Sequence, residues 1–245
     1  HYFVALYSDG SIRGWGRNTS GPLDVPALPA GLSYVELAAG SEFVVARRSD
    51  GSVVAWGKNS AGQCVVPPLP GGLSYVEVAA GDESAMARRS DGSVVAWGRR
   101  FLDPRGVPAL PAGQSYVEIA AEGEHPLARR SDGSVVTWGF ASASVPVLPA
   151  GLSWVEIDAG NGYGLARRSD GEVEAWGAND WGQRGVPPLP SGITYVEIAA
   201  LGDSCFARRS DGAVVGWGRL SDSNLSAPVL PSSRAYIALG DTART

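Results

Sequence analysis

The sequence predicts an all-β protein of one domain, residues 1–245, built as a six-bladed β-propeller with four antiparallel strands in each blade. Three periodic features predict this fold. The tripeptide Ser-Asp-Gly occurs six times, a Trp-Gly pair follows each copy, and a Tyr or Trp recurs with the same spacing of 41 or 38 residues. A repeat of about 40 residues that holds several short strands is typical of propeller blades. The three series are Asp9, Asp50, Asp91, Asp132, Asp170 and Asp211; Trp15, Trp56, Trp97, Trp138, Trp176 and Trp217; and Tyr34, Tyr75, Tyr116, Trp154, Tyr195 and Tyr236.

The strands of one blade can be assigned in the unit that begins at Tyr34. Residues 34–40 (YVELAAG) are a short apolar run that predicts strand a, and residues 41–48 (SEFVVARR) predict strand b. Ser-Asp-Gly suits a tight hairpin turn, so strand b should pair directly with strand c at residues 52–57 (SVVAWG), which is β-branched and aromatic. A polar loop follows. The Val-Pro beyond it predicts a short strand d at the blade edge, where proline is tolerated.

The two ends of the chain together predict the sixth blade. The chain starts inside a strand b at residues 2–7 and finishes just after a strand a at residues 236–239, so pairing of these two strands would close the ring. A Glu of strand a recurs opposite an Arg of strand b, as in Glu36 and Arg47, and in the terminal blade Ala238 and Leu6 replace both. The loss of both charges in the same blade is expected if the Glu and the Arg are cross-strand partners. The predicted blades are 1–33 with 236–240, 34–74, 75–115, 116–153, 154–194 and 195–235.

Two segments carry a family resemblance. Residues 45–63 (VARRSDGSVVAWGKNSAGQ) and 165–183 (LARRSDGEVEAWGANDWGQ) resemble the regulator-of-chromosome-condensation repeat, which is marked by A-L-x-x-D-G followed by W-G-x-N-x-x-G-Q. The resemblance implies a propeller. Known members include a chromatin-bound exchange factor for a small GTPase, a plant ultraviolet-B photoreceptor and a secreted bacterial inhibitor of β-lactamases, all with seven blades where this sequence counts six. A propeller is a scaffold whose activity depends on its loops.

Loop variation predicts which face of the ring binds a partner. The Ser-Asp-Gly turns and the Leu-Pro connections barely vary among the six units, whereas the a–b and c–d loops vary in sequence and length. Such loops are where binding residues are placed, so we expect aromatic anchors there and an acidic rim that steers towards a basic surface of a protein partner. In an alternative interpretation several of the aromatic residues cap the blade cores. The predicted partner-binding residues are Tyr2, Glu42, Phe43, Glu83, Phe101, Glu124, His125, Phe140, Tyr163, Asp180, Trp181 and Asp203, with Trp181 foremost because it lies outside the Trp-Gly series.

Composition argues against other classes of function. A net charge of −5 does not favour nonspecific nucleic-acid binding, and no apolar run approaches the ~18 residues of a membrane span. The two histidines have no ligand spacing, so no metal or cofactor is predicted, and Cys64 and Cys205 are interpreted as free thiols.

An enzyme or small-ligand site in the central channel is the competing hypothesis. Asp158 would carry it, because this residue interrupts the Ala-Ala that recurs in strand a. No nucleophile elbow, phosphate loop or catalytic triad stands out, so we expect a monomeric, non-enzymatic protein-binding propeller. A secreted enzyme inhibitor of the β-lactamase-inhibiting kind is the most concrete form that the resemblance implies. Arg outnumbers Lys 19 to 1, which fits a bacterium with a GC-rich genome, and a secreted location is favoured over a cytoplasmic one.

Overall fold

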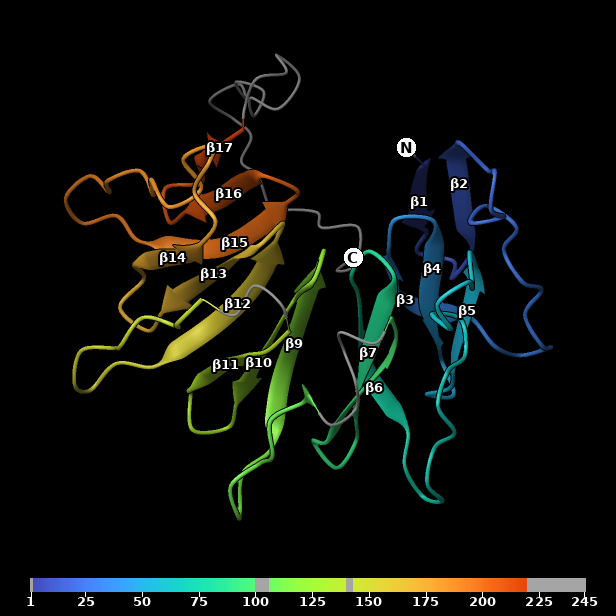
Figure 1. The fold of residues 1–245 in the computed structure, drawn as a ribbon. Helices are drawn as coiled ribbons and strands as arrows, with labels where there is room; N and C mark the ends of the chain where they lie inside the picture. The colour runs from blue at the N-terminus through green and yellow to red at the C-terminus, as the bar shows by residue number, and fades with distance from the viewer. Residues whose placement is uncertain (1, 100–105, 140–142, 220–245) are drawn as a thin grey trace.

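The computed structural model describes residues 2–99, 106–139 and 143–219, and in these ranges the chain is all-β, as predicted. Each sheet is formed by strands consecutive in sequence, and all pairs are antiparallel. The sheets follow one another along an arc from β1 to β17, with the first strands of the three-stranded sheets on its inner side (Figure 1). The sheets are β1 (Tyr2–Leu6) with β2 (Ile12–Gly16); β3 (Tyr34–Ala39), β4 (Phe43–Arg48) and β5 (Val53–Gly57); β6 (Tyr75–Ala80), β7 (Ser84–Arg89) and β8 (Val94–Gly98); β9 (Tyr116–Glu122), β10 (His125–Arg130) and β11 (Val135–Thr137); β12 (Trp154–Gly160), β13 (Tyr163–Arg168) and β14 (Val173–Gly177); and β15 (Tyr195–Leu201), β16 (Ser204–Arg209) and β17 (Val214–Gly218).

The Ser-Asp-Gly turn joins strands b and c, as the sequence predicts. In the second unit, Arg48 N donates to Ser52 O (2.8 Å) and Gly51 N donates to Arg48 O (2.9 Å). Only the glycine takes a positive φ, at +79°, and the Asp50 carboxylate accepts hydrogen bonds from the amide and the hydroxyl of Ser52. This is a three-residue hairpin loop with the glycine at the left-handed position.

The cross-strand Glu–Arg pairs are confirmed. A β-bulge after the first residue of β3 exposes Val35 and brings Glu36 opposite Arg47, whose Nε donates to Glu36 Oε2 at 2.7 Å. The same pairing recurs in the other three-stranded sheets, with Nε–Oε2 distances of 2.7 to 2.8 Å. The other carboxylate oxygen of Glu36 accepts the Val78 amide of the next unit (3.1 Å). Glu77 and Glu156 accept the Ile119 and Ile198 amides in the same way, so these Glu residues pair with their own strand b and also bond to the neighbouring sheet.

The predicted fourth strand is not observed in the described part of the chain, where five sheets have three strands and the first sheet has two. The Val-Pro segments run without regular ladder bonds because their prolines have no N–H to donate. Side chains hold the segment instead. Val66 and Leu69 pack against the core, and the Tyr75 hydroxyl donates to Pro67 O at 2.7 Å.

The hydrophobic core lies between neighbouring sheets. One cluster joins Phe43 and Val45 of β4 to Tyr75, Val78 and Trp97 of the next unit, and four further clusters repeat the arrangement along the arc. Five of the six Trp-Gly tryptophans are buried in these clusters, with 4 to 7% of their surface exposed. Trp15 of the first sheet is 54% exposed. The strand expected at residues 236–239, and Ala238 within it, lie outside the described residues, so ring closure stays a prediction.

Candidate functional site

Three of the predicted anchors, Phe43, His125 and Tyr163, are fully buried, and the expectation that they are exposed is wrong. Each begins the second strand of its sheet (β4, β10 or β13), where the side chain turns into the core and away from the loop. The Phe43 and Tyr163 rings lie over Gly40 and Gly160, at which an added Cβ would come within 2.0 Å of the ring. The alternative that these aromatics cap the blade cores is therefore correct for them.

Tyr2 is half-buried and connects the first two units. Its hydroxyl lies 2.8 Å from Gly40 O and 2.6 Å from Phe43 O, both in the next unit. Burial raises the pKa of this hydroxyl, with a smaller contribution from the Glu42 carboxylate. Tyr163 occupies the equivalent position and donates to Ser204 O, 41 residues later, at 2.7 Å. These tyrosines fasten neighbouring hairpins, which leaves them little surface for a partner.

The predicted acidic residues of the second to fourth units belong to a row of ion pairs, which we call the charged belt: Glu42, Lys58, Glu83, Arg99 and Glu124. Lys58 Nζ lies 2.8 Å from Glu83 Oε1 and 3.8 Å from Glu42 Oε2. Arg99 Nη1 lies 3.3 Å from Glu83 Oε2 and 3.4 Å from Glu124 Oε1. Hydrogen bonding to Lys58 lowers the pKa of Glu83. The belt carries bases between its acids, so this arc of the face is less acidic than the sequence suggests.

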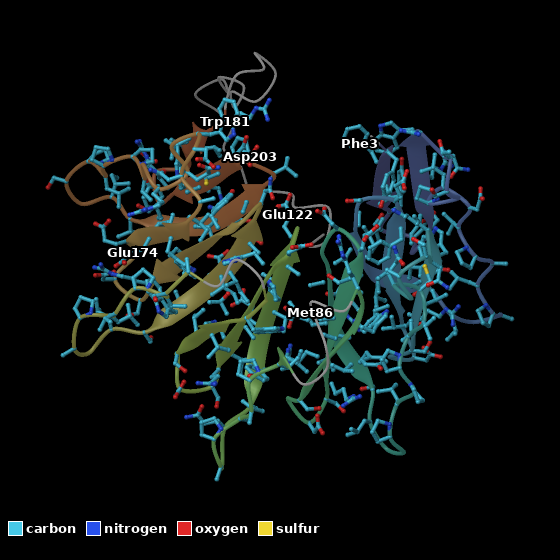
Figure 2. The ribbon with its side chains drawn as sticks, viewed as in Figure 1. Phe3, Met86, Glu122, Glu174, Trp181 and Asp203 are labelled. Atoms are coloured by element: carbon cyan, nitrogen blue, oxygen red, sulfur yellow. The ribbon has the colours of Figure 1, made fainter. Side chains whose placement is uncertain are left out.

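Trp181 stands in a second group, the Trp181 cluster: Asn161, Asp180, Trp181, Asp203 and Arg219. The Trp181 ring is 49% exposed, and Arg219 Cζ lies 4.3 Å from its centroid. Arg219 Nη1 is 3.5 Å from Asp203 Oδ2, and Asn161 Nδ2 donates to Asp203 Oδ1 at 3.3 Å. Asp180 is exposed beside the tryptophan. Trp181 and Asp203 therefore lie together across the last two sheets (Figure 2).

The loop that carries Trp181 is held in place from beneath. The Gln183 side chain, 1% exposed, accepts the Trp181 amide at 3.0 Å. The Gln183 carbonyl accepts the indole N–H of Trp217 at 2.7 Å, and Asn179 Oδ1 accepts the Arg184 amide. An exposed aromatic ring on a preorganised loop loses little conformational freedom on binding. The sequence-based reading missed Gln183 and Arg219, although the Gly-Gln of the repeat motif marks the first of them.

Phe101 and Phe140, the remaining predicted anchors, lie outside the described residues.

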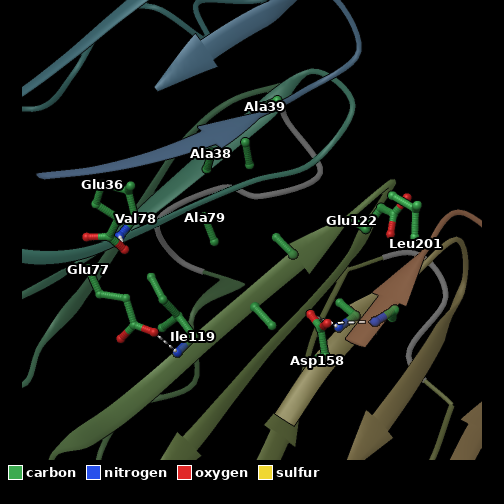
Figure 3. A pocket seen from close by; sticks show the side chains of 15 residues that line it. Glu36, Ala38, Ala39, Glu77, Val78, Ala79, Ile119, Glu122, Asp158 and Leu201 are labelled. Atoms are coloured by element: carbon green, nitrogen blue, oxygen red, sulfur yellow. Dashed lines mark hydrogen bonds between the residues drawn. The ribbon is translucent and has the colours of Figure 1, made fainter. Parts of the chain in front are cut away.

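The inner side of the arc holds a small cavity of about 110 Å³ (Figure 3). Alanines line most of it, together with Asp158 and Glu122. Asp158 Oδ1 accepts the Ala159 amide (2.8 Å) and Oδ2 accepts the Ala200 amide of the next unit (2.7 Å). Glu122 Oε1 accepts the Gly202 amide at 2.7 Å. Both carboxylates thus bond to the backbone of the last unit.

Glu122 lines this cavity and is not among the acidic residues predicted from the sequence. Glu122 and Leu201 replace the glycine that ends strand a in other units, such as Gly40 and Gly81. This departure from the repeat was the feature of the sequence that could have marked Glu122 as a site residue. Within the described ranges no three His, Cys, Asp or Glu side chains are grouped to hold a metal ion. The same residues contain no helix long and apolar enough to cross a membrane.

Comparison with known families and structures supports the propeller fold. Residues 34–63 match the regulator of chromosome condensation (RCC1) repeat, which confirms the resemblance seen in the sequence. A search of curated protein sequences gave no significant match. Among solved structures, the ectodomain of the Physcomitrella patens receptor kinase CR4 superposes with a TM-score of 0.70 at 20% identity, over 90% of this chain and 61% of the other.

Two further structures have the same architecture. The ectodomain of the Arabidopsis thaliana receptor kinase ACR4 gives a TM-score of 0.67 at 21% identity, over 89% of this chain and 80% of that one. Yeast RCC1 (Prp20), solved bound to Kap60, gives 0.64 at 23% identity, over 77% and 56%. The chain therefore spans about three fifths of the CR4 ectodomain and of Prp20. At these identities the likeness establishes an RCC1-type propeller fold, with sheets arranged as blades.

Proposed function

We propose that this chain is a non-enzymatic, protein-binding scaffold whose partner docks on the face formed by the a–b and c–d loops, with Trp181 as the central anchor. The observation that carries the proposal is the exposed indole of Trp181 on a loop fixed by Gln183. Equivalent positions in other units hold Ser20 and Ala61, so the repeat scaffold does not require an aromatic ring there. Trp and Arg are the residues most enriched among interface hot spots, and here Arg219 lies against the Trp181 ring.

The charged belt indicates which part of the loop face the partner contacts. It runs through the second to fourth units, where its members satisfy one another. In the fifth unit Gly162 and Ala178 occupy the acid and base positions, so the belt is interrupted next to Trp181. Partner binding at this interruption needs fewer ion pairs to be desolvated, which favours the Trp181 cluster as the centre and the belt residues Glu42, Glu83 and Glu124 as the rim.

Relatives supply the class of partner. Prp20 was solved bound to Kap60, and its binding to Gsp1p and histones has been described, so propellers of this type bind proteins. We extend protein binding, and not those particular partners, to this chain. A secreted inhibitor of an enzyme such as a β-lactamase is the more specific hypothesis and rests on sequence resemblance alone. The six predicted units, as a closed monomeric ring, would form the rigid support for this face.

The experiment is a quantitative pull-down with wild type and Trp181→Ala, using bacterial lysate, secreted protein and purified β-lactamases as separate inputs. Loss of a hot-spot tryptophan costs about 2 kcal/mol or more, so the variant should hold its partner about 30-fold less tightly. Val147→Ala is the matched control, because Val147 is 94% exposed and lies outside the Trp181 cluster. A partner retained equally by wild type and Trp181→Ala would disprove the assignment.

A further inference from the structure

The tips of the a–b hairpins are linked to one another along the inner side of the arc. Ser41 N donates to Asp82 O at 3.2 Å, and Asp82 N donates to Gly123 O at 3.1 Å. In the last two units Asn161 N donates to Gly202 O at 2.9 Å. Between the fourth and fifth units, in the described part of the chain, no backbone bond joins Gly123 to Asn161. The series of linked hairpin tips is therefore interrupted at this step.

Glu122 bridges the interrupted step from the fourth unit to the sixth. Its Oε1 accepts the amide of Gly202, 80 residues later, at 2.7 Å. A side chain is present here because Glu122 stands where Gly40 and Gly160 end strand a in other units. Glu122 and Leu201, the residue before Gly202, line the same cavity (Figure 3). The bond passes over the fifth unit, whereas the hairpin-tip bonds join adjacent units.

Gly202 and Asp203 form the turn between β15 and β16. Leu201 and Ser204 pair on either side of these two residues, and Gly202 has a positive φ of +59°. A glycine at the first central position is typical of a type II′ hairpin turn. The turn is so short that the Gly202 amide lies one residue from the Asp203 side chain. The bond to Glu122 therefore fixes the backbone from which Asp203 projects.

Asp203 in turn holds Arg219 against the Trp181 ring. The Asp203 carbonyl accepts the Arg219 amide at 3.0 Å, and Asp203 Oδ2 lies 3.5 Å from Arg219 Nη1. Asn161 Nδ2 donates to the other carboxylate oxygen at 3.3 Å. Arg219 Cζ lies 4.3 Å from the centroid of the Trp181 ring. A path of direct contacts thus runs from Glu122 through the hairpin turn to the exposed indole.

We infer that Glu122 is a positioning residue for the Trp181 cluster, although it lies on the inner side of the arc. By holding the Gly202 amide, Glu122 sets the place of Asp203 and so the way in which Arg219 covers the indole. Preorganisation of this kind reduces the freedom that a binding surface loses when its partner docks. The inference rests on the proposed function, in which the Trp181 cluster is the centre of the binding face.

Fluorine NMR of protein labelled with 5-fluorotryptophan tests this path without any partner. The Trp181 resonance is assigned by its absence from Trp181→Phe. Glu122→Ala should shift that resonance, because Arg219 is no longer held over the ring. Glu122→Gln should leave it in place, because an amide oxygen accepts the same N–H. Glu122→Gly introduces the residue that the repeat has at Gly40, so it should keep the fold and shift the resonance as Glu122→Ala does.

Hydrogen exchange provides the second measurement. The Gly202 amide should exchange about 10-fold faster or more in Glu122→Ala, since a bond to a charged acceptor is lost, and close to the wild-type rate in Glu122→Gln. Ser41→Ala is the matched control, because the Ser41 hydroxyl donates to Asp82 Oδ1 at 2.8 Å and so links two hairpin tips of the second and third units. This control should change neither the Trp181 resonance nor the Gly202 exchange rate.

Three outcomes would overturn the inference: an unmoved Trp181 resonance in Glu122→Ala and Glu122→Gly, an equal shift in Ser41→Ala, or a shift in Glu122→Gln as large as in Glu122→Ala. In the pull-down, Glu122→Ala should retain the partner about 3- to 10-fold less than wild type, a smaller loss than for Trp181→Ala because the indole itself remains. A partner retained in full by Trp181→Ala would disprove the proposed function, whereas the fluorine spectra judge Glu122 independently of any partner.

Discussion

The two faces of the propeller differ in what their turns contact. On the Ser-Asp-Gly face, the first five turns bond to the next unit through the same atoms: Gly51 O accepts the Tyr75 amide at 2.9 Å, and a Cβ at Gly51 would meet Ser74, the residue before Tyr75. On the loop face, the acid and base that pair between units in the charged belt give way to Gly162 and Ala178 in the fifth unit. The contacts of the turns recur through the same atoms on the first face, whereas the side-chain pairs between units change on the second.

The difference shows why one face is uniform in sequence. A turn residue that forms part of an interface between units cannot change unless its neighbour changes too, whereas a loop residue that only meets solvent or an ion partner can. Interunit contact, and not turn geometry alone, therefore explains the six Ser-Asp-Gly copies. The accepting carbonyls on this face, each bonded to the first amide of the next unit, are those of Gly10, Gly51, Gly92, Gly133 and Gly171.

The largest effect should come from Gly51→Ala compared with Gly62→Ala, one glycine from each face. Their φ values are +79° and +80°, so the backbone penalty for alanine is the same, about 1 kcal/mol. A Cβ at Gly51 would lie 2.5 Å from Ser74 Cβ, whereas nothing lies within 4 Å at Gly62. We expect the free energy of unfolding to fall by about 3 kcal/mol for Gly51→Ala and about 1 kcal/mol for Gly62→Ala, measured by urea denaturation. Equal losses would show that turn geometry alone keeps the glycine.

A smaller loss is expected when a contact between units is compared with one inside a unit. Glu77 accepts from Arg88 at 2.7 Å and from the Ile119 amide of the next unit at 3.2 Å. Glu174 is more exposed and pairs with Arg168 of its own sheet at 3.0 Å. Glu77→Ala should destabilise by about 2 kcal/mol, because a half-buried guanidinium and an amide lose their acceptor, and Glu174→Ala by about 0.5 kcal/mol. Thermal unfolding of both variants would contradict this account if Glu174→Ala cost as much.

The sequence alone was sufficient to predict the features of the fold that are local and repeated. The hairpin turn and the Glu36–Arg47 pair follow from periodicity and strand register, and both are confirmed. Burial of Phe43 could not be read from its place beside a loop, because the side chain packs against the next unit. Gly40, three residues earlier, was the only local trace of that packing.

Contacts between units also escaped prediction on the loop face. The acidity expected at Glu83 is offset by Lys58 of the preceding unit, and the sequence does not show that the two meet. A strand d was expected at Val-Pro, but side-chain contacts from Tyr75 replace the backbone ladder. Among the predicted aromatic anchors in the described part of the chain, Trp181 is the one that is largely exposed, because it departs from the repeat and makes none of the repeated core contacts.

The smallest effect is expected from a comparison of two Ser-Asp-Gly turns, in which the aspartate carboxylates of Asp50 and Asp211 are stabilised by different partners. At Asp50 the hydrogen bond from the Ser52 hydroxyl is the main cause that lowers the carboxyl pKa, whereas at Asp211, followed by Ala213 in place of a serine, Arg209 is the main cause. Because both pKa values are lower in the folded protein, each carboxylate stabilises the fold above the unfolded-state pKa of about 4, and this stabilisation is lost as pH falls through the folded-state value. Asp50→Asn and Asp211→Asn should therefore differ from wild type in melting temperature at pH 7 and converge with it towards pH 2.

Salt distinguishes the two turns. Asp211 meets a cation, so about 1 M NaCl at pH 7 should shrink the effect of Asp211→Asn, since exposed charges are screened within about 3 Å at that ionic strength. Asp50 chiefly accepts from a neutral hydroxyl, so the effect of Asp50→Asn should change less. Equal salt sensitivity in the two variants would mean that the nearby Arg48 charge, and not Ser52, governs the Asp50 turn. The two turns would then differ in sequence but not in the interaction that holds them.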